Sequence, residues 1–240
     1  MARRRFFVDR IHGDRAELNG DEARHVARVL RAEVGQQSEL SDKQCAFLAE
    51  ISEVGAQRVT FRIVEPLAPE PQSPAITIFA ALIKFDRFEW LVEKATELGV
   101  ARIVPVDADR AEEGLARAAA KRVDRWKKIA RESSQQARRL RIPEIAVPAT
   151  FEAAVSDVTA VRFFLDERPG ADPLLRALPA DRTLSDAIAI LTGPEGGWTD
   201  RERALAAGAG WKPVSLGRQI LRAETAAIAA LAILGQAWQI

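Results

Sequence analysis

The sequence contains few of the residues from which disulfides and metal sites are built. It has one cysteine, Cys45, and two histidines, His12 and His25. A single cysteine excludes an intramolecular disulfide and a zinc site made of several cysteines. Two histidines are also too few for a typical His-based metal site. We therefore predict that the protein works without a bound metal ion.

Long apolar runs are scarce as well. No N-terminal segment has the order of basic, apolar and small residues that marks a signal peptide. No apolar run is clearly long enough to cross a membrane, and the nearest one, residues 226–234, follows a charged turn and is succeeded by Gly235 and Gln236. These features predict a cytoplasmic protein.

The sequence also has no excess of positive or negative charge. The chain has 35 Lys and Arg against 34 Asp and Glu, which gives a net charge of +1. Such a chain has no overall attraction to nucleic acid, so any binding of this kind must come from local basic patches. Two segments of the sequence carry such patches.

The first patch lies near the N-terminus, where three arginines occupy positions 3–5. A helix is expected over residues 21–33, with Asp21 as its N-cap and Val26, Val29 and Leu30 at helical spacing. Along this helix four basic side chains recur every three to four residues: Arg24, His25, Arg28 and Arg31. Guanidinium groups match phosphate oxygens, so this face suits a nucleic-acid backbone. A solvated face with local ion pairs explains the pattern equally well.

The second patch lies on a long helix expected over residues 118–140. Its basic residues include Lys121, Arg122, Arg125, Lys127, Lys128, Arg131, Arg138 and Arg139. Only Asp124 and Glu132 oppose them. This surplus favours a contact with nucleic acid over a simple solvated face.

A proline-rich segment, residues 65–74, divides the chain. Prolines cannot continue a helix or sit in a central strand, and this segment holds Pro66, Pro69, Pro71 and Pro74. Before it, strands are expected over residues 6–8, 45–54 and 58–65. These short strands and the single helix predict a small β-barrel domain over residues 1–68.

After the prolines, strands and helices alternate. Apolar strands are expected over residues 75–83, 100–106, 162–166, 187–191 and 214–216. Helices are expected over residues 88–98, closed by Gly99, over 118–140, and after Thr199. This alternation predicts an α/β fold over residues 75–240, with a parallel sheet covered by helices on both faces.

The last helix, which begins near Glu224, has almost no polar face, because residues 226–234 are all Ala, Ile or Leu. A helix that is apolar all round must be buried, either inside its own domain or against another subunit. The sequence leaves both outcomes open, and the second predicts a homodimer.

Two loops between a strand and a helix carry the strongest signal. Residues 191–198 read Leu-Thr-Gly-Pro-Glu-Gly-Gly-Trp, and they lead into a capping box formed by Thr199 and Glu202. Residues 215–225 read Ser-Leu-Gly-Arg-Gln-Ile-Leu-Arg-Ala-Glu-Thr. Glycines let a backbone approach a ligand closely, and such loops form the ligand crevice of open α/β sheets. Neither loop is a P-loop or a dinucleotide fingerprint, and glycines that only turn the chain are the alternative.

Together the two loops resemble the SPOUT superfamily of RNA methyltransferases. Gly-Pro-Glu-Gly-Gly followed by Leu-Gly-x-x-Ile-Leu-Arg-x-Glu-Thr is most similar to the ribosomal RNA small subunit methyltransferase E family. Residues 5–8, 25–31, 93–100 and 132–143 also resemble that family. The resemblance implies a PUA-like RNA-binding barrel followed by a SPOUT domain with a C-terminal trefoil knot. It also implies a homodimer that uses S-adenosylmethionine to methylate N3 of a uridine in 16S rRNA of the small ribosomal subunit.

The resemblance further implies roles for individual residues. The cofactor would be held by Leu191, Gly193, Glu195, Gly196, Gly197, Leu216, Gly217, Ile220 and Leu221. RNA would be contacted by Arg5, His25, Arg28 and Arg31. For catalysis, the chemistry of the uridine N3 proton leads to a separate hypothesis: Arg222 would stabilise negative charge on the uracil oxygens, and Glu224 would orient Arg222 or accept the proton. The alternative is an ion pair, Arg222–Glu224 or Arg218–Glu195, that only fixes the loop.

One segment departs from the family pattern. The family has Arg followed by Ser after the second strand of this domain, whereas here Arg110 is followed by Ala111 and Glu112. Two other functions fit the same sequence. One is a SPOUT methyltransferase that acts on another RNA, such as tRNA or 23S rRNA. The other is a non-catalytic RNA-binding assembly factor, which would have no need of both glycine loops.

Overall fold

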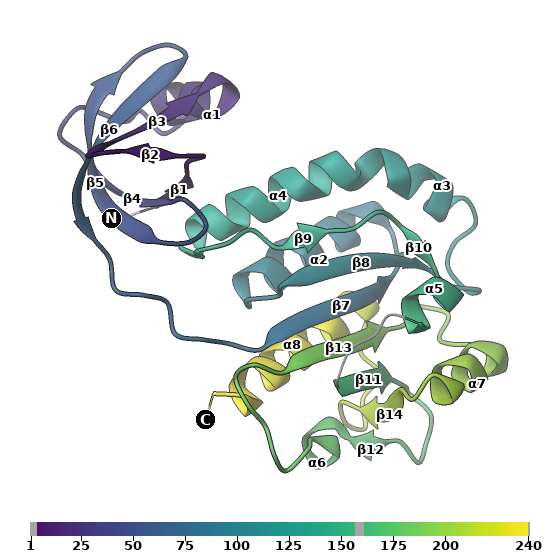
Figure 1. Cartoon of the computed structure of the whole chain (residues 1–240). Coiled ribbons are helices and arrows are strands. Elements are labelled where there is room, and N and C mark those ends of the chain that lie inside the picture. The colour runs from purple at the N-terminus through teal and green to yellow at the C-terminus, as the bar shows by residue number, and fades with distance from the viewer. Residues whose placement is uncertain (1–3, 157–160, 240) are drawn as a thin grey trace. The chain divides into compact units, whose positions relative to one another are not determined.

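The computed structural model describes residues 4–156 and 161–239. Two compact units divide the chain (Figure 1). The first comprises the residues up to Pro71 together with the segment Ser134–Ile142, and the second comprises Gln72–Ser133 and the residues from Pro143 onward. Each unit has its own sheet.

The first unit is built on a six-stranded sheet in the order β1-β4-β5-β6-β3-β2. Its strands are β1 (Arg5–Phe7), β2 (Ile11–His12), β3 (Arg15–Asn19), β4 (Gln37–Ser41), β5 (Ala46–Val54) and β6 (Arg58–Pro66). The pairing of β1 with β4 is parallel and the other pairings are antiparallel. The strands expected at β1, β5 and β6 are confirmed.

Alternation along the strands builds the core of this unit. Val59 and Phe61 of β6 are buried, and so are Ala16 and Leu18 of β3, whose neighbours along the strand are exposed or half-buried. Successive side chains of a strand point to opposite faces, so each strand gives one row of side chains to the core. The sequence analysis did not predict β3, although its five residues have this alternation.

The helix expected over residues 21–33 is shorter and has a different period. Helix α1 (Gly20–Arg24) continues as a π-helix, η1 (His25–Val29), and Asn19, not Asp21, occupies the N-cap. A π-helix bonds residue i to i+5, as Leu30 N to His25 O at 3.1 Å, and this wider turn shifts the phase of the side chains. Val26 is therefore fully buried while Val29 is 66% exposed, so these two residues do not share a buried face in spite of their helical spacing in the sequence.

The segment Ser134–Ile142 is bound to the first unit by polar contacts. Ser41 Oγ donates to Leu140 O at 2.7 Å, and Arg141 Nε donates to Lys43 O at 3.0 Å. Arg138 has a left-handed backbone with φ of 53°, which ends the preceding helix. The expected continuous helix over residues 118–140 was therefore wrong. Instead, α3 (Leu115–Ala119), a 3-10 turn, η2 (Ala120–Arg122), and α4 (Val123–Gln136) follow one another.

The second unit contains an eight-stranded sheet in the order β10-β8-β7-β13-β11-β14-β12, with β9 beside β8. Its strands are β7 (Ala75–Ala81), β8 (Arg102–Asp107), β9 (Glu144–Ile145), β10 (Ala149–Thr150), β11 (Val161–Leu165), β12 (Asp172–Pro173), β13 (Ala187–Thr192) and β14 (Lys212–Ser215). Every pairing between them is parallel. The predicted α/β fold and its five longer strands are confirmed, whereas the two-residue strands were not predicted.

Helices cover this sheet. They are α2 (Phe85–Glu97), α5 (Phe151–Val155), α6 (Leu174–Ala177), α7 (Asp200–Gly208) and α8 (Ala223–Ala237), beside α3 and α4. Helix α8 packs on β7, β13 and α2, whereas α5 and α7 pack against each other (Figure 1). Alternate strand residues therefore meet different helices, and Phe79, Leu191 and Trp198 join the core on the side of α5 and α7.

Candidate functional site

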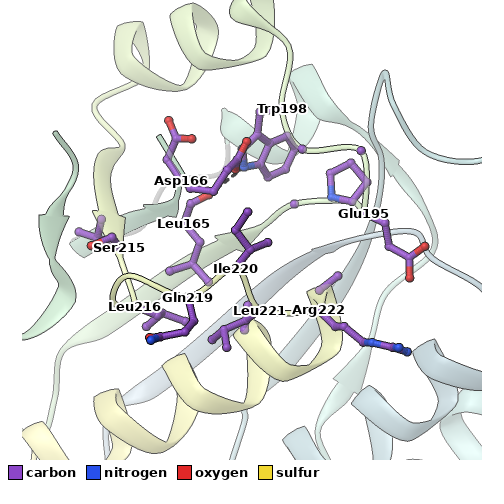
Figure 2. A pocket seen from close by; sticks show the side chains of 18 of the residues that line it. Leu165, Asp166, Glu195, Trp198, Ser215, Leu216, Gln219, Ile220, Leu221 and Arg222 are labelled. Atoms are coloured by element: carbon purple, nitrogen blue, oxygen red, sulfur yellow. Dashed lines mark hydrogen bonds between the residues drawn. The ribbon is translucent and has the colours of Figure 1, made fainter. Parts of the chain in front are cut away.

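A pocket of about 450 Å³ lies at the carboxyl ends of β11, β13 and β14, which are neighbours in the sheet (Figure 2). Its wall consists of Leu165, Asp166, Glu167, Gly193, Pro194, Glu195, Gly196, Gly197, Trp198, Val214, Ser215, Leu216, Gly217, Gln219, Ile220, Leu221, Arg222, Ala223 and Ala226. The two glycine loops singled out in the sequence thus form two sides of one pocket. Open parallel sheets bind their ligands at this edge.

Each glycine of the first loop has a close neighbour on the side where a side chain would stand. A Cβ on Gly193 would lie 3.0 Å from the ring of Trp198, and a Cβ on Gly196 would lie 3.0 Å from the Cβ of Arg110. Gly197 has a left-handed backbone with φ of 67°, and a Cβ there would lie 2.7 Å from Glu167 Oε1. The loop therefore presents bare backbone to the pocket because the side chains of Trp198, Arg110 and Glu167 already occupy the space beside it.

The structure brings most of the expected cofactor residues together. Those that line the pocket are Gly193, Glu195, Gly196, Gly197, Leu216, Gly217, Ile220 and Leu221. Leu191 lies one step back, inside β13, where its side chain is fully buried and does not form part of the wall. Ile220 is 88% exposed, so the second loop offers an uncovered apolar side chain at the mouth of the pocket.

The two expected catalytic residues occupy the start of α8. Arg222 is its N-cap residue and lines the pocket, while Glu224 in the first turn lies behind the wall and is 8% exposed. Glu224 Oε2 is buried without a hydrogen-bond partner. Within residues 4–156 and 161–239 neither of the alternative ion pairs, Arg222–Glu224 and Arg218–Glu195, forms, and Glu195 pairs with Arg87 of α2 instead. In Figure 2 the side chains of Glu195 and Arg222 extend at the same end of the pocket.

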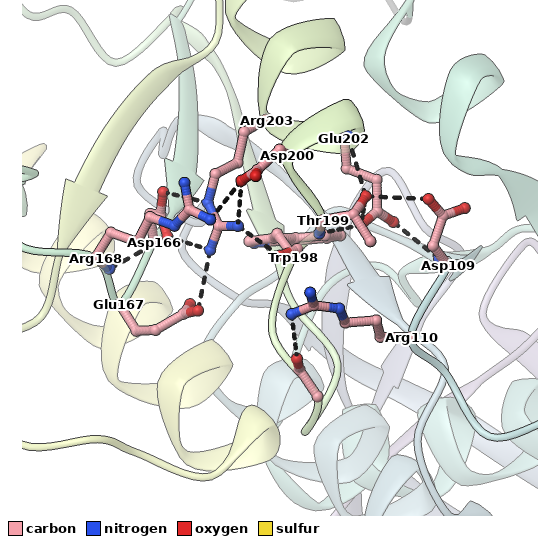
Figure 3. Close-up of polar contacts among 11 residues, drawn as sticks. Asp109, Arg110, Asp166, Glu167, Arg168, Trp198, Thr199, Asp200, Glu202 and Arg203 are labelled. Carbon is pink, nitrogen blue, oxygen red and sulfur yellow. Dashed lines mark hydrogen bonds and ion pairs between the residues drawn. The ribbon is translucent and has the colours of Figure 1, made fainter.

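A third wall of the pocket was missed by the sequence analysis. It consists of Leu165, the last residue of β11, and of Asp166 and Glu167, which follow the strand. Trp198 Nε1 donates to Leu165 O at 2.9 Å, and Arg203 of α7 binds both acids (Figure 3). Burial raises the pKa of Asp166, but the hydrogen bonds from Arg203 and from the Arg168 backbone outweigh it, so this pKa lies below its ordinary value. The sequence places a strand here but does not show that it lies between the strands of the two loops.

A second polar cluster anchors the start of α7 and confirms the predicted capping box. Thr199 Oγ1 accepts from Glu202 N, and Glu202 Oε2 accepts from Thr199 N at 2.7 Å. Fully buried Glu202 also accepts from Asp109 N at 2.9 Å (Figure 3). The next residue, Arg110, donates to Gly196 O at 3.1 Å, so the segment that departs from the family pattern touches the first glycine loop.

The expected RNA-contacting residues belong to the first unit and differ in exposure. Arg28 and Arg31 are exposed and His25 is half-buried. The side chain of Arg5 is only 9% exposed, and it pairs with Glu39 at 3.0 Å and with Glu70 at 2.9 Å. Arg3 lies outside the described residues.

The basic patch on α4 is partly neutralised within the second unit. Arg125 binds Glu89 of α2 at 2.5 Å, and Arg122 lies 3.7 Å from the same carboxylate. Lys127 and Lys128 are near Asp124 and Glu132. The patch therefore offers less free positive charge than its composition indicates. No helix within residues 4–156 and 161–239 has the length and apolar character of a membrane span.

Comparisons with known proteins agree with this architecture. Residues 70–235 match the family described as RNA methyltransferase domain, and residues 18–64 match the RNA methyltransferase PUA domain. Ribosomal RNA small subunit methyltransferase E from Synechocystis is 35% identical over 72% of this chain, and the matched region spans 57% of that protein.

Two solved structures share the whole fold. Ribosomal RNA small subunit methyltransferase E from Neisseria gonorrhoeae, bound to S-adenosyl methionine, superposes with a TM-score of 0.87 at 28% identity and covers 99% of this chain and 98% of its own. A putative methyltransferase from Legionella pneumophila, in complex with the same cofactor, gives a TM-score of 0.87 at 32% identity with equal coverage. The chain therefore belongs to the ribosomal RNA small subunit methyltransferase E family of RNA methyltransferases.

Proposed function

We propose that this protein transfers a methyl group from S-adenosylmethionine to N3 of a uridine in 16S rRNA of the small ribosomal subunit. The observation that carries the proposal is the single pocket formed by both glycine loops at the ends of β11, β13 and β14. The Neisseria gonorrhoeae relative that shares the whole fold is named ribosomal RNA small subunit methyltransferase E, and its structure is described with S-adenosyl methionine bound.

The residues of the pocket fit this cofactor. A volume of about 450 Å³ is within the usual range for small-molecule sites. Bare backbone at Gly193, Gly196 and Gly197 allows a nucleoside to approach closely, while Leu216 and Leu221 supply apolar walls. Asp166 and Glu167 add negative charge that suits a cationic ligand. When bound, S-adenosylmethionine supplies an electrophilic methyl group on a positively charged sulfur.

Arg222 and Glu224 are the proposed catalytic residues. Uridine N3 carries a proton at neutral pH, and its loss leaves negative charge on the uracil oxygens. Arg222 lies in the pocket wall without an ion-pair partner in the described part of the chain, so its guanidinium is available to those oxygens. Glu224 has a buried oxygen with no partner at the positive end of α8, which suits an acceptor for the proton or for a bond from Arg222.

The proposal also assigns a role to each of the two domains. We assign residues 1–68 to a PUA-like RNA-binding domain, in which Arg28, Arg31 and His25 contact RNA, and residues 75–240 to the SPOUT domain. We also propose the C-terminal trefoil knot that the resemblance implies. The strand order is compatible with it, since β14 enters the sheet between β11 and β12.

We also propose a homodimer that uses α8. Its residues Ile228, Ala229, Ala232 and Ile233 are only half-buried within one chain, although none of them is polar. A second subunit would cover this apolar face. Since the proposed substrate is ribosomal RNA, the proposal also places the protein in the cytoplasm.

The test is methyl transfer from labelled S-adenosylmethionine to small ribosomal subunits that lack the modification, followed by mass spectrometry of the methylated base. We expect 3-methyluridine in 16S rRNA. A methyl label on 23S rRNA or tRNA would show that another RNA is the substrate, while the methyl-transfer reaction would stand. Binding of the RNA without methyl transfer would favour the assembly factor.

Variants separate catalysis from binding. We expect Arg222→Ala and Glu224→Gln each to lower kcat by about 100-fold or more, with little change in cofactor affinity measured by calorimetry. Arg218→Ala is the matched control, because this arginine lies in the same loop but does not line the pocket. Full activity of Arg222→Ala would contradict the catalytic role of Arg222.

A further inference from the structure

Arg203 of α7 joins two walls of the pocket without lining it. Its guanidinium binds Asp166 in a fork, with Nε to Oδ2 and Nη2 to Oδ1 both at 2.9 Å. Nη2 also donates to Glu167 Oε1 at 3.0 Å, and Nη1 donates to Trp198 O. One side chain thus ties the residues that follow β11 to the glycine loop that follows β13 (Figure 3).

The two acids that Arg203 binds are not equivalent. Asp166 uses both oxygens for the fork and its side chain is 8% exposed, so it serves as an internal anchor. Glu167 gives one oxygen to Arg203, and its side chain is 46% exposed in the pocket wall. Glu167 therefore keeps acceptor capacity for a ligand, because an ionised carboxylate has several lone-pair sites.

The backbone of the glycine loop is adapted to this arrangement. Gly197 has the left-handed φ of 67°, and a Cβ there would lie 2.7 Å from the oxygen of Glu167 that Arg203 binds. Trp198 is fully buried, with its ring stacked on Phe164 and its N–H bound to Leu165 O. Arg203 and the Gly197 backbone thus place Glu167 before any ligand binds, while Trp198 fixes the strand end that precedes it.

We propose that Arg203 is a positioning residue for the cofactor, which holds Glu167 ready to accept hydrogen bonds from the hydroxyl or ammonium groups of S-adenosylmethionine. This inference rests on the proposed function. A pre-set acceptor costs the ligand no reorganisation, and a lysine cannot reproduce the fork because it has a single ammonium group.

The same helix supplies a matched control. Arg201 also binds two carboxylates, Asp109 at 2.8 Å and Glu152 at 2.6 Å. Neither acid lines the pocket. Replacement of Arg201 removes two ion pairs from α7, and replacement of Arg203 removes three, those to Asp166, Glu167 and Asp200. Only the replacement of Arg203 disturbs the pocket wall.

The test measures the dissociation constant of S-adenosylmethionine by calorimetry for the full chain and for Arg203→Gln, Arg203→Lys, Arg201→Gln and Glu167→Gln. We expect Arg203→Gln to weaken binding at least ten-fold, Arg203→Lys to recover part of the loss, and Arg201→Gln to bind within two-fold of the wild type. Glu167→Gln should weaken binding alone and add little to Arg203→Gln, because both act on one interaction.

Unchanged binding by Arg203→Gln, or an equal loss in Arg201→Gln, would overturn the positioning role. If the wild-type protein itself bound no S-adenosylmethionine, the proposed function would fail as well. If only the positioning role is wrong, the wild-type protein still binds the cofactor, so the two failures are distinguishable. Circular dichroism checks that each variant is folded. Should Arg203→Gln not fold, Arg203→Lys and Glu167→Gln decide the question, because unchanged binding by both would also overturn the inference.

Discussion

At the scale of single residues, the effect of a glycine depends on the atoms that a Cβ would meet at its position. Gly99 and Gly197 both have a left-handed backbone, but a Cβ on Gly99 would meet no atom within 4 Å, whereas one on Gly197 would meet Glu167. The same residue type therefore serves to turn the chain in one place and to admit a carboxylate in the other.

This difference predicts the effect of alanine. Gly99→Ala and Gly197→Ala should each destabilise the fold by about 1–2 kcal/mol through backbone strain. Only Gly197→Ala should also weaken binding of S-adenosylmethionine, because it displaces Glu167. Thermal unfolding and calorimetry measure the two effects separately. Equal affinities for the two variants would contradict the argument.

Arg5 and Arg28 show that a shared residue type does not give a shared role. Arg5 and Glu39 form an ion pair with both side chains 9% exposed, whereas Arg28 is exposed. Arg5→Ala should destabilise the first unit by about 3 kcal/mol, because it leaves Glu39 buried with less compensation. Arg28→Ala should leave stability unchanged and weaken RNA binding in a salt-dependent way. Urea unfolding measures stability, and filter binding at two salt concentrations measures RNA affinity. An Arg5→Ala variant that is as stable as the wild type but binds RNA poorly would contradict the stabilising role of Arg5.

At the scale of elements, α7 is fixed by its capping box and by Arg201. The hydrogen bonds from Arg201 lower the pKa of Asp109 and of Glu152 below their ordinary values. Acids with a lowered pKa in the folded state stabilise it above their unfolded pKa of about 4, and this contribution is lost as the pH falls further.

Stability should therefore decline below about pH 4, and Arg201→Gln should make this decline shallower. Urea unfolding at pH 7 and pH 3 provides the measurement. For each protein, we take the difference between the unfolding free energies at pH 7 and pH 3, and we compare this difference between wild type and variant. An identical difference in wild type and variant would show that these ion pairs do not contribute.

At the scale of the whole molecule, α8 carries an apolar face that its own chain covers only in part. Ile233→Asp should raise the dissociation constant of the proposed dimer at least about 100-fold, because an unpaired charge would be buried in the interface. Val34→Asp is the control, since Val34 is 65% exposed and belongs to the first unit. Light scattering after gel filtration gives the mass, and circular dichroism checks folding. A wild-type monomer, or an unaffected dimer, would contradict the role of α8.

The sequence by itself determined the features that depend on neighbours along the chain. Periodicity predicted the five longer strands of the parallel sheet, and Thr199 with Glu202 predicted the start of α7, because caps and strands form from residues a few positions apart. The spelling of the glycine loops identified eight residues that share the pocket wall.

Tertiary structure alone decided what depends on residues distant in the sequence. The position of β11 between β13 and β14 brings Asp166 and Glu167 to the pocket, and only packing makes Arg203 their partner. The π-helix at His25–Val29 and the attachment of Ser134–Ile142 to the first unit likewise depend on contacts between residues distant in the sequence. Local propensities differ by about 1 kcal/mol per residue or less, so burial and ion pairs between distant segments overrule them.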